Sequence, residues 1–197
     1  MVEATTTVAV DAERRDALAD RLFHALLETL ELTSVYLGLR LDLYAALRDG
    51  GPATPAGLAA RAGIDERYAR EWLEQQAVAG LLEVGESSAS EDSLPFRLPA
   101  AHAEVLLDVS SPAHAAAAAL FVGSIAQVLQ RLPEAYRTGA GVPYADYGAD
   151  CRHGIARFNQ PMFANELQGW LAAAPDVRAR LQTEPAARVL DVACGLG

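Results

Sequence analysis

Start and stop signals for two short helices lie close together in the segment TPAGLAARAGIDERYAREWLEQQAVAG. Thr54 is an N-cap residue directly before Pro55, a residue favoured at the first helical position, and Gly63 is a typical helix stop. Asp65 then caps a second helix that ends at Gly80. Two short helices joined by a tight, glycine-containing turn predict a helix-turn-helix.

The next segment has the pattern of a two-stranded wing. LLEV and PFRLP lie on either side of the polar, acidic loop GESSASEDS, and such runs around a turn-rich segment predict a hairpin. Together with the helix-turn-helix, they predict a winged helix over residues from about 34 to 100.

A winged helix can bind DNA, but the charges of the second helix argue against DNA binding in this chain. The chain carries a formal net charge of -10. From Asp65 to Gln76, four acidic residues outnumber two basic ones: Asp65, Glu66, Glu71 and Glu74 against Arg67 and Arg70. Because such a face repels phosphate, we expect no nucleic-acid partner.

Two helical runs precede the winged helix. From Asp11 to Glu31, leucine and phenylalanine residues recur at three- and four-residue steps, which predicts one amphipathic helix. The run SVYLGLRLDLYAAL predicts a second helix over residues 34–49 that stops at Gly50-Gly51. These helices carry more apolar surface than one small winged helix can cover, so we expect a homodimer formed through the N-terminal half.

Further helices follow the winged helix. Ser111-Pro112 is expected to open an alanine-rich helix that Pro133 closes. After the linker GAGVPYADYGAD, the run HGIARFNQPMFANELQGWLAA is helical again, with a kink or fresh start at Pro161 and an end at Pro175.

The last ten residues, RVLDVACGLG, have the pattern of a cofactor site. Residues 188–192 form a short apolar run typical of a buried strand, and the small residues that follow predict a tight turn where the backbone can approach a ligand: Ala193, Gly195 and Gly197. Dinucleotide-binding enzymes share such a turn, so the discriminating residue is Asp191. A buried acid at the end of a strand requires a cationic or hydrogen-bond-donating partner.

VLDVACGLG closely resembles the first motif of class I S-adenosylmethionine-dependent methyltransferases, with Ala193 in place of the more usual glycine. The resemblance implies that Asp191 positions the methionine end of S-adenosylmethionine and that the backbone of Ala193, Gly195 and Gly197 lines it. The order of winged helix, further helices and this motif is similar to that of small-molecule O-methyltransferases. In those enzymes the winged helix serves dimerisation and covers the substrate.

The segment FNQPM is similar to the FNxxM segment that borders the acceptor pocket in the same enzymes, which implies that Phe158, Asn159 and Met162 bind the substrate. Core packing is the alternative explanation, because Ile155, Phe158 and Met162 share one stripe of an ideal helix.

The expected fold is mainly α. We expect a disordered N-terminus over residues 1–10, a winged-helix dimerisation domain over 11–110 and a helical linker and substrate lid over 111–182. Residues 183–197 are expected to supply only the first strand and glycine-rich turn of a Rossmann-like α/β methyltransferase domain. A doubly wound sheet needs on the order of a hundred further residues, so the sequence is expected to be truncated at this motif.

These patterns predict the N-terminal part of an enzyme that transfers a methyl group from S-adenosylmethionine to a small-molecule hydroxyl, with an amine as the less favoured acceptor. The 197 residues alone are expected to be inactive. No metal is expected, because Cys151 and Cys194 lie far apart without histidines at ligand spacing. Without a secretory signal or a long apolar run, the expected location is cytoplasmic, with no membrane partner. The alternative function is a winged-helix transcriptional regulator or ligand sensor.

Overall fold

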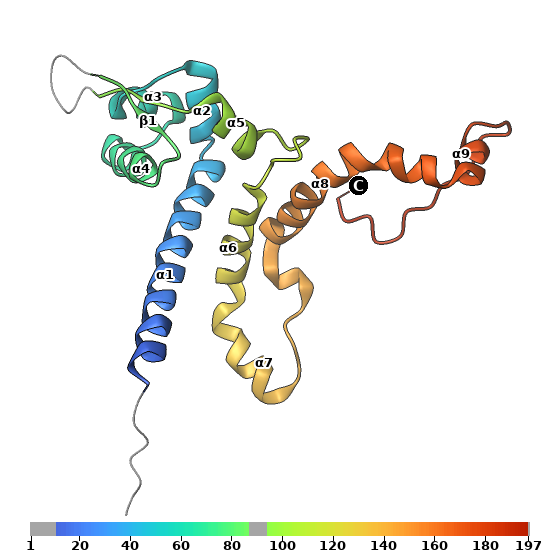
Figure 1. Cartoon of the computed structure of the whole chain (residues 1–197), viewed down its shortest axis with the longest axis horizontal. Coiled ribbons are helices and arrows are strands. Elements are labelled where there is room, and N and C mark those ends of the chain that lie inside the picture. Colours follow the sequence, from blue (N-terminus) through green and yellow to red (C-terminus); the bar gives the residue numbers. More distant parts are fainter. Residues whose placement is uncertain (1–10, 87–93, 197) are drawn as a thin grey trace, which may run out of the picture.

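The computed structural model describes residues 11–86 and 94–196. In these residues the chain forms helices joined by short loops, with one two-stranded sheet. Figure 1 shows the winged-helix part at one end of the long helix α1, with α6 beside α1, and α8 leading away toward α9. Residues 1–10, which the sequence predicts to be disordered, lie outside the described residues, as does Gly197.

Helix α1 (Ala12–Arg40) is longer than the sequence predicts. The boundary expected between residues 31 and 34 is wrong, because no proline or glycine stands there. The hydroxyls of Thr29 and Thr33 instead donate to the carbonyls four residues earlier, at 2.7 and 2.8 Å. The break falls at Asp42, whose φ of 54° is left-handed, and α2 (Leu43–Gly50) follows it.

The two helices of the helix-turn-helix are confirmed with the caps that the sequence predicts. In α3 (Pro55–Ala62), the Thr54 hydroxyl accepts a hydrogen bond from the Gly57 amide at 3.2 Å. In α4 (Glu66–Val78), the Asp65 carboxylate accepts one from the Arg67 amide at 2.9 Å. Gly63 between them has a φ of 66°, which glycine adopts without strain.

The wing is a short antiparallel pair. Strands β1 (Glu83–Val84) and β2 (Phe96–Arg97) are joined by a loop whose middle, residues 87–93, lies outside the described part. Ala53 extends the pair through an isolated bridge to Phe96, with N···O distances of 3.0 and 2.8 Å. Helix α5 (Ala100–Leu107), which the sequence analysis does not anticipate, follows the wing.

Residues of α1, α2, α3 and α4 contribute to the winged-helix core. Tyr44, Leu58 and Leu73 are completely enclosed, and the Tyr44 hydroxyl donates to the buried amide oxygen of Gln76. The Trp72 ring meets Tyr44 edge to face at 5.0 Å, and its indole nitrogen donates to the Ser34 carbonyl at 3.0 Å. These contacts fasten α4 to the C-terminal half of α1.

The alanine-rich helix α6 (Ala117–Val128) begins later than Ser111-Pro112, and Pro133 does not close it. A 3-10 turn, η2 (Leu129–Arg131), leads directly into α7 (Leu132–Thr138), where Pro133 occupies the first turn, a position in which its missing amide hydrogen costs nothing.

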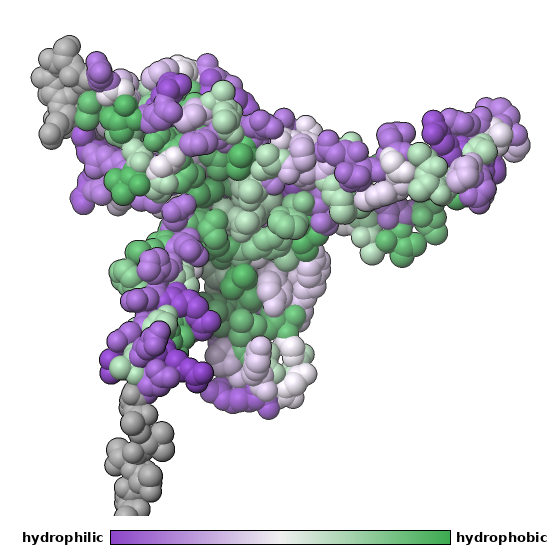
Figure 2. Space-filling model, viewed as in Figure 1, coloured by the Kyte–Doolittle hydropathy of each residue, from purple (hydrophilic) through white to green (hydrophobic). Residues whose placement is uncertain are grey.

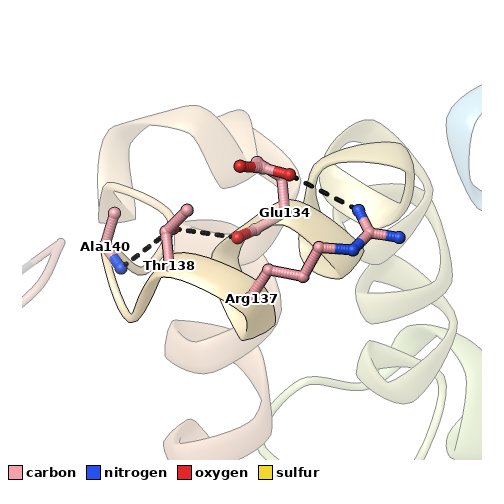
Figure 3. Close-up of polar contacts among 4 residues, drawn as sticks. All are labelled: Glu134, Arg137, Thr138 and Ala140. Carbon is pink, nitrogen blue, oxygen red and sulfur yellow. Dashed lines mark hydrogen bonds and ion pairs between the residues drawn. The ribbon is translucent and has the colours of Figure 1, made fainter.

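Helix α7 ends at Gly139, whose φ is 73°. Beside it the Thr138 hydroxyl donates to the Glu134 carbonyl at 2.9 Å and accepts from the Ala140 amide at 3.4 Å, while Arg137 pairs with the Glu134 carboxylate at 3.4 Å (Figure 3). At this end of α7 the chain turns back toward α6.

A 3-10 turn, η3 (Tyr144–Tyr147), precedes α8 (Gly148–Ala173). Pro161 lies inside α8 without ending it, and the ribbon of α8 changes direction along its length (Figure 1). Pro175 does not simply stop the helix: α8 ends at Ala173, and Pro175 opens α9 (Pro175–Leu181). Within the first half of α8, Gly154 packs closely on Leu120 and Phe121 of α6.

The mainly helical fold class is confirmed, but the strand expected over residues 188–192 does not form. These residues have no strand partner among the described residues, and Val189, Leu190 and Val192 are 77%, 85% and 78% exposed. A parallel strand is stable only when neighbouring strands satisfy its backbone groups and helices cover its faces. In residues 11–86 and 94–196, no helix is both long and apolar enough to cross a membrane.

Candidate functional site

The predicted cofactor turn has an unusual backbone. Ala193 and Gly195 both have left-handed φ values, 63° and 69°. Glycine adopts this region freely, whereas alanine does so at a cost of about 1 kcal/mol because of its Cβ atom. The turn therefore has a backbone that suits glycine at both positions, and Ala193 is the strained one. Gly197, the third predicted position, lies outside the described residues.

Asp191, the predicted cofactor-positioning acid, lies on the exposed segment that leads into this turn. It makes no hydrogen bond or ion pair with any residue in the described part of the chain. Its carboxylate is thus free to receive a cationic partner, but the apolar residues on either side of it are uncovered. The structure thus shows an exposed carboxylate directly before the turn at Ala193 and Gly195.

The predicted substrate residues lie on the middle of α8. Phe158 and Met162, four residues apart, share one helix face and are 58% and 45% exposed, while Asn159 is half-buried. The Phe158 ring contacts Phe121 of α6 edge to face at 6.3 Å. Core packing explains only the part of the Phe158 side chain that contacts Phe121, because most of this helix face is exposed.

A buried carboxylate fixes the first turn of α8. Asp150 is 5% exposed and accepts a hydrogen bond from the Tyr36 hydroxyl at 2.7 Å and one from the Arg40 guanidinium at 3.2 Å. Hydrogen bonding to the carboxylate, helped by burial, raises the pKa of Tyr36. Gly123 of α6 lets the Tyr36 ring approach, since a Cβ there would lie 2.6 Å from the ring. Through this cluster, α1 and α6 set where α8 begins.

The sequence does not predict the Asp150 cluster. Tyr36 and Arg40 lie 114 and 110 residues from Asp150, so no local pattern connects them. The available signal was an acid in the first turn of a helix, which favours helix formation but indicates no partner.

A second set of hydrogen bonds holds α8 in place near Pro161. The Asn165 side chain donates to the carbonyls of Pro161 and Ser110, at 2.7 and 2.9 Å. Ser110 belongs to the connection between α5 and α6, so this amide joins α8 to the end of the winged helix. The face that carries Phe158 and Met162 is therefore anchored on both sides, at Asp150 and at Asn165.

The recognition-helix position of the winged helix is occupied by α4, and its arginines are held by acids of the same helix. Arg67 pairs with Glu71 at 3.6 Å and Arg70 with Glu66 at 4.0 Å. In the residues that the structure describes, no group of three or more His, Cys, Asp and Glu side chains could hold a metal ion.

The comparisons with known proteins agree with this architecture. Residues 30–107 match the family model described as the Rv2258c-like winged HTH domain. The solved structure of the mitomycin 7-O-methyltransferase MmcR is similar, with a TM-score of 0.55 and 22% sequence identity over 82% of this chain and 49% of that one. No curated protein matches the sequence.

Two further solved structures match with lower scores. PigF with SAH has a TM-score of 0.49 and 19% identity over 76% of this chain and 47% of that one. Human N-acetylserotonin methyltransferase in complex with SAM has a TM-score of 0.49 and 14% identity over 86% of this chain and 50% of that one. The chain spans about half the length of the solved structures it matches. At the level of the fold, the winged-helix match and the likeness to MmcR confirm the resemblance read from the sequence.

Proposed function

We propose that this chain is the N-terminal part of a class I S-adenosylmethionine-dependent methyltransferase that methylates a hydroxyl group of a small molecule. The observation that carries the proposal is the left-handed backbone of Ala193 and Gly195 directly after Asp191, where the first motif of that family has its small-residue turn. The likeness in fold to MmcR supports it, because a winged helix and the following helices precede the motif in the same order.

In this proposal, Asp191 holds the ammonium end of the cofactor, and the backbone of residues 193–197 approaches it closely. S-adenosylmethionine supplies the methyl group and a sulfonium leaving group. The chain's own residues bind and orient: Phe158 and Met162 offer apolar contact to the acceptor and Asn159 offers an amide. Holding the acceptor in line with the methyl group is the main source of rate enhancement for such a transfer.

The anchoring of α8 fits this role. A face that positions an acceptor must be held to within a fraction of an ångström, which requires support behind it. The Asp150 cluster and the Asn165 tie provide that support from α1, α6 and the α5–α6 connection.

Calorimetric titration with S-adenosylmethionine tests the proposal. The 197 residues alone should bind it only in the millimolar range or not at all, and should be inactive, because the described residues form one edge of the site. A protein extended through the rest of the cofactor domain should bind it. Asp191→Ala should then weaken binding about tenfold or more, the equivalent of one lost hydrogen bond to a charged group.

Glu166→Ala is the matched control, since Glu166 is an exposed acid on α8, outside the turn, and its loss should leave affinity unchanged. Equal affinities for the parent and Asp191→Ala would show that the motif is misassigned. Submillimolar binding by the 197 residues alone would contradict the one-edge argument.

A DNA-binding regulator is the alternative that the winged helix raises. The charges of α4 argue against it, because both of its arginines have acidic partners one turn away on the same helix. A gel-shift assay at low salt should show no retained duplex, whereas sequence-specific retention at physiological salt would favour the regulator. The choice of a hydroxyl over an amine acceptor and the cytoplasmic location stay predictions.

A further inference from the structure

An apolar groove of about 480 Å³ lies between α1 and α4. Leu37 and Leu41 of α1 form one wall. Tyr68 and Trp72 of α4 form the other. Figure 1 shows α4 and α8 on opposite sides of α1, so this groove is separate from the helix face that carries Phe158 and from the predicted cofactor turn. The proposed methyltransferase reaction does not use it.

Contacts within the winged helix fix the walls of the groove in place. The indole nitrogen of Trp72 donates to the Ser34 carbonyl of α1 at 3.0 Å, and its ring packs edge to face on the buried Tyr44. Gly38 allows α1 to approach this closely, since a Cβ there would lie 2.7 Å from the Trp72 ring. Small-molecule sites are concave, mostly apolar, largely pre-formed and between about 300 and 1,000 Å³ in volume. The groove has each of these properties.

The charged side chains that line the groove are both acidic. Asp65 and Glu71 lie along its α4 side, and Ser34 and Gln75 are the uncharged polar residues of the lining. Arg67 pairs with Glu71 at 3.6 Å, but the two side chains are 81% and 65% exposed, so solvent weakens this pair. Figure 2 shows hydrophobic and hydrophilic residues side by side over α1 and α4. The groove thus combines an apolar interior with negative charge at one side.

A third acid adds to this negative charge from α1. Burial raises the pKa of Tyr44, and the charge of Glu31 raises it further. Glu31 therefore acts on the ring that supports Trp72, and it lies one turn before Ser34 on the same helix. Acids on both helices favour a positively charged group in the groove.

We propose that this groove binds a small apolar molecule that carries an amine, with its apolar body between Leu37 and Trp72 and its ammonium group toward Asp65 and Glu71. Tyr68 also lines the groove and is 71% exposed, and its ring adds a cation–π contact to the same group. The acids would repel an anionic ligand, which excludes a carboxylate or phosphate compound of the same shape. The inference does not depend on the proposed methyltransferase activity.

Isothermal titration calorimetry with three probes of similar shape tests the charge argument on the 197-residue chain. The probes are biphenylylpropylamine, the corresponding alcohol and the corresponding carboxylate. The amine should bind with a submillimolar Kd, about fivefold more tightly than the alcohol, which is the upper end for an exposed ion pair. The carboxylate should bind more weakly than either. High salt should reduce the preference for the amine, because it screens exposed charges.

Two pairs of variants locate the bound probe. Glu71→Gln should bring the affinity for the amine close to that for the alcohol, whereas Glu74→Gln, which changes an acid of the same helix outside the groove, should keep the preference. Leu37→Gln should weaken binding of all three probes. Val78→Gln is its control, because Val78 is 91% exposed and lies outside the groove, and this variant should bind them as the parent does. Far-UV circular dichroism checks that each variant folds.

The fluorescence of Trp72 reports occupancy of the groove directly. The chain has two tryptophans, so Trp170→Phe leaves Trp72 as the only one, and the amine should shift its emission. Light scattering on the same samples tests whether the homodimer expected from the sequence covers the groove instead. Equal affinities for the three probes, an unchanged Trp72 emission, or binding that disappears at the protein concentrations where the mass doubles from 20.9 kDa would overturn the proposal.

Discussion

Tyr36→Phe removes a single oxygen from the Asp150 cluster and should destabilise the chain measurably. Asp150 is 5% exposed, so its carboxylate cannot replace the 2.7 Å hydrogen bond from Tyr36 with bulk water. Hydrogen bonds to charged groups contribute about 1.5–3 kcal/mol, and because Tyr36 is only half-buried we take the lower end, about 1.5 kcal/mol. For a chain of this size that corresponds to a fall of about 3–6 °C in Tm.

The other donor should matter less. Arg40 reaches Asp150 at 3.2 Å, but its side chain is 53% exposed, so solvent screens the pair and Arg40→Gln should cost about 0.5 kcal/mol. The assay is urea denaturation followed by far-UV circular dichroism at one fixed protein concentration. Tyr136→Phe is the control: Tyr136 is 90% exposed, and its hydroxyl should contribute less than about 0.5 kcal/mol.

The cluster also predicts the response to alkaline pH. The pKa of Tyr36 is raised above its ordinary value by its hydrogen bond to Asp150 and by burial. The unfolded chain therefore loses this proton at lower pH than the folded chain, so stability should fall as pH rises above about 10, and Tyr36→Phe should lose that part of the fall. Equal stability of Tyr36→Phe and the parent, or a larger loss from Arg40→Gln, would refute the reasoning.

Two other features give testable predictions. Gly38→Ala should destabilise the chain by about 1–3 kcal/mol in urea denaturation, because the new Cβ would lie 2.7 Å from the Trp72 ring and closer still to Tyr44. Gly169→Ala is the control: a Cβ there would have nothing within 4 Å, so this variant should stabilise the chain by up to about 1 kcal/mol. Burial lowers the pKa of His114, so the free energy of unfolding should fall as pH drops below about 6.5. His114→Phe should show a smaller fall between about pH 7.5 and pH 5, and an unchanged pH dependence would contradict this.

Local signals predicted the helix-turn-helix well because its helix starts and its turn depend on residues within one turn. Thr54, Asp65 and Gly63 cap or stop their helices through contacts with amides two or three residues away or through their own backbone angle. The same reasoning failed at residues 31–34, where nothing local ends the helix, and at Pro133 and Pro175. A proline disfavours the helix before it and favours the one it opens, and sequence alone does not say which effect prevails.

For the candidate site, the sequence predicts only local features, such as a tight turn at small residues. The small residues at 193 and 195 were assigned to a tight turn, and the left-handed angles there agree with that assignment. The support behind α8 could not be predicted in the same way. Asp150 accepts hydrogen bonds from Tyr36 and Arg40 of α1, which lie more than a hundred residues earlier, and an acid in a first helical turn indicates no such partners.

The segment 188–192 shows how far an apolar pattern can determine structure. Its residues have the composition of a buried strand, yet Val189, Leu190 and Val192 are among the most exposed apolar side chains described. The pattern specifies a preference for burial on both faces, and only neighbouring strands and covering helices can satisfy it. The turn that follows has left-handed angles at Ala193 and Gly195, although no strand pairs with the preceding residues in the described part of the chain. The same ten residues thus contain the turn and an uncovered strand pattern that requires the rest of a sheet, which is why binding of S-adenosylmethionine should depend on residues that the turn alone does not supply.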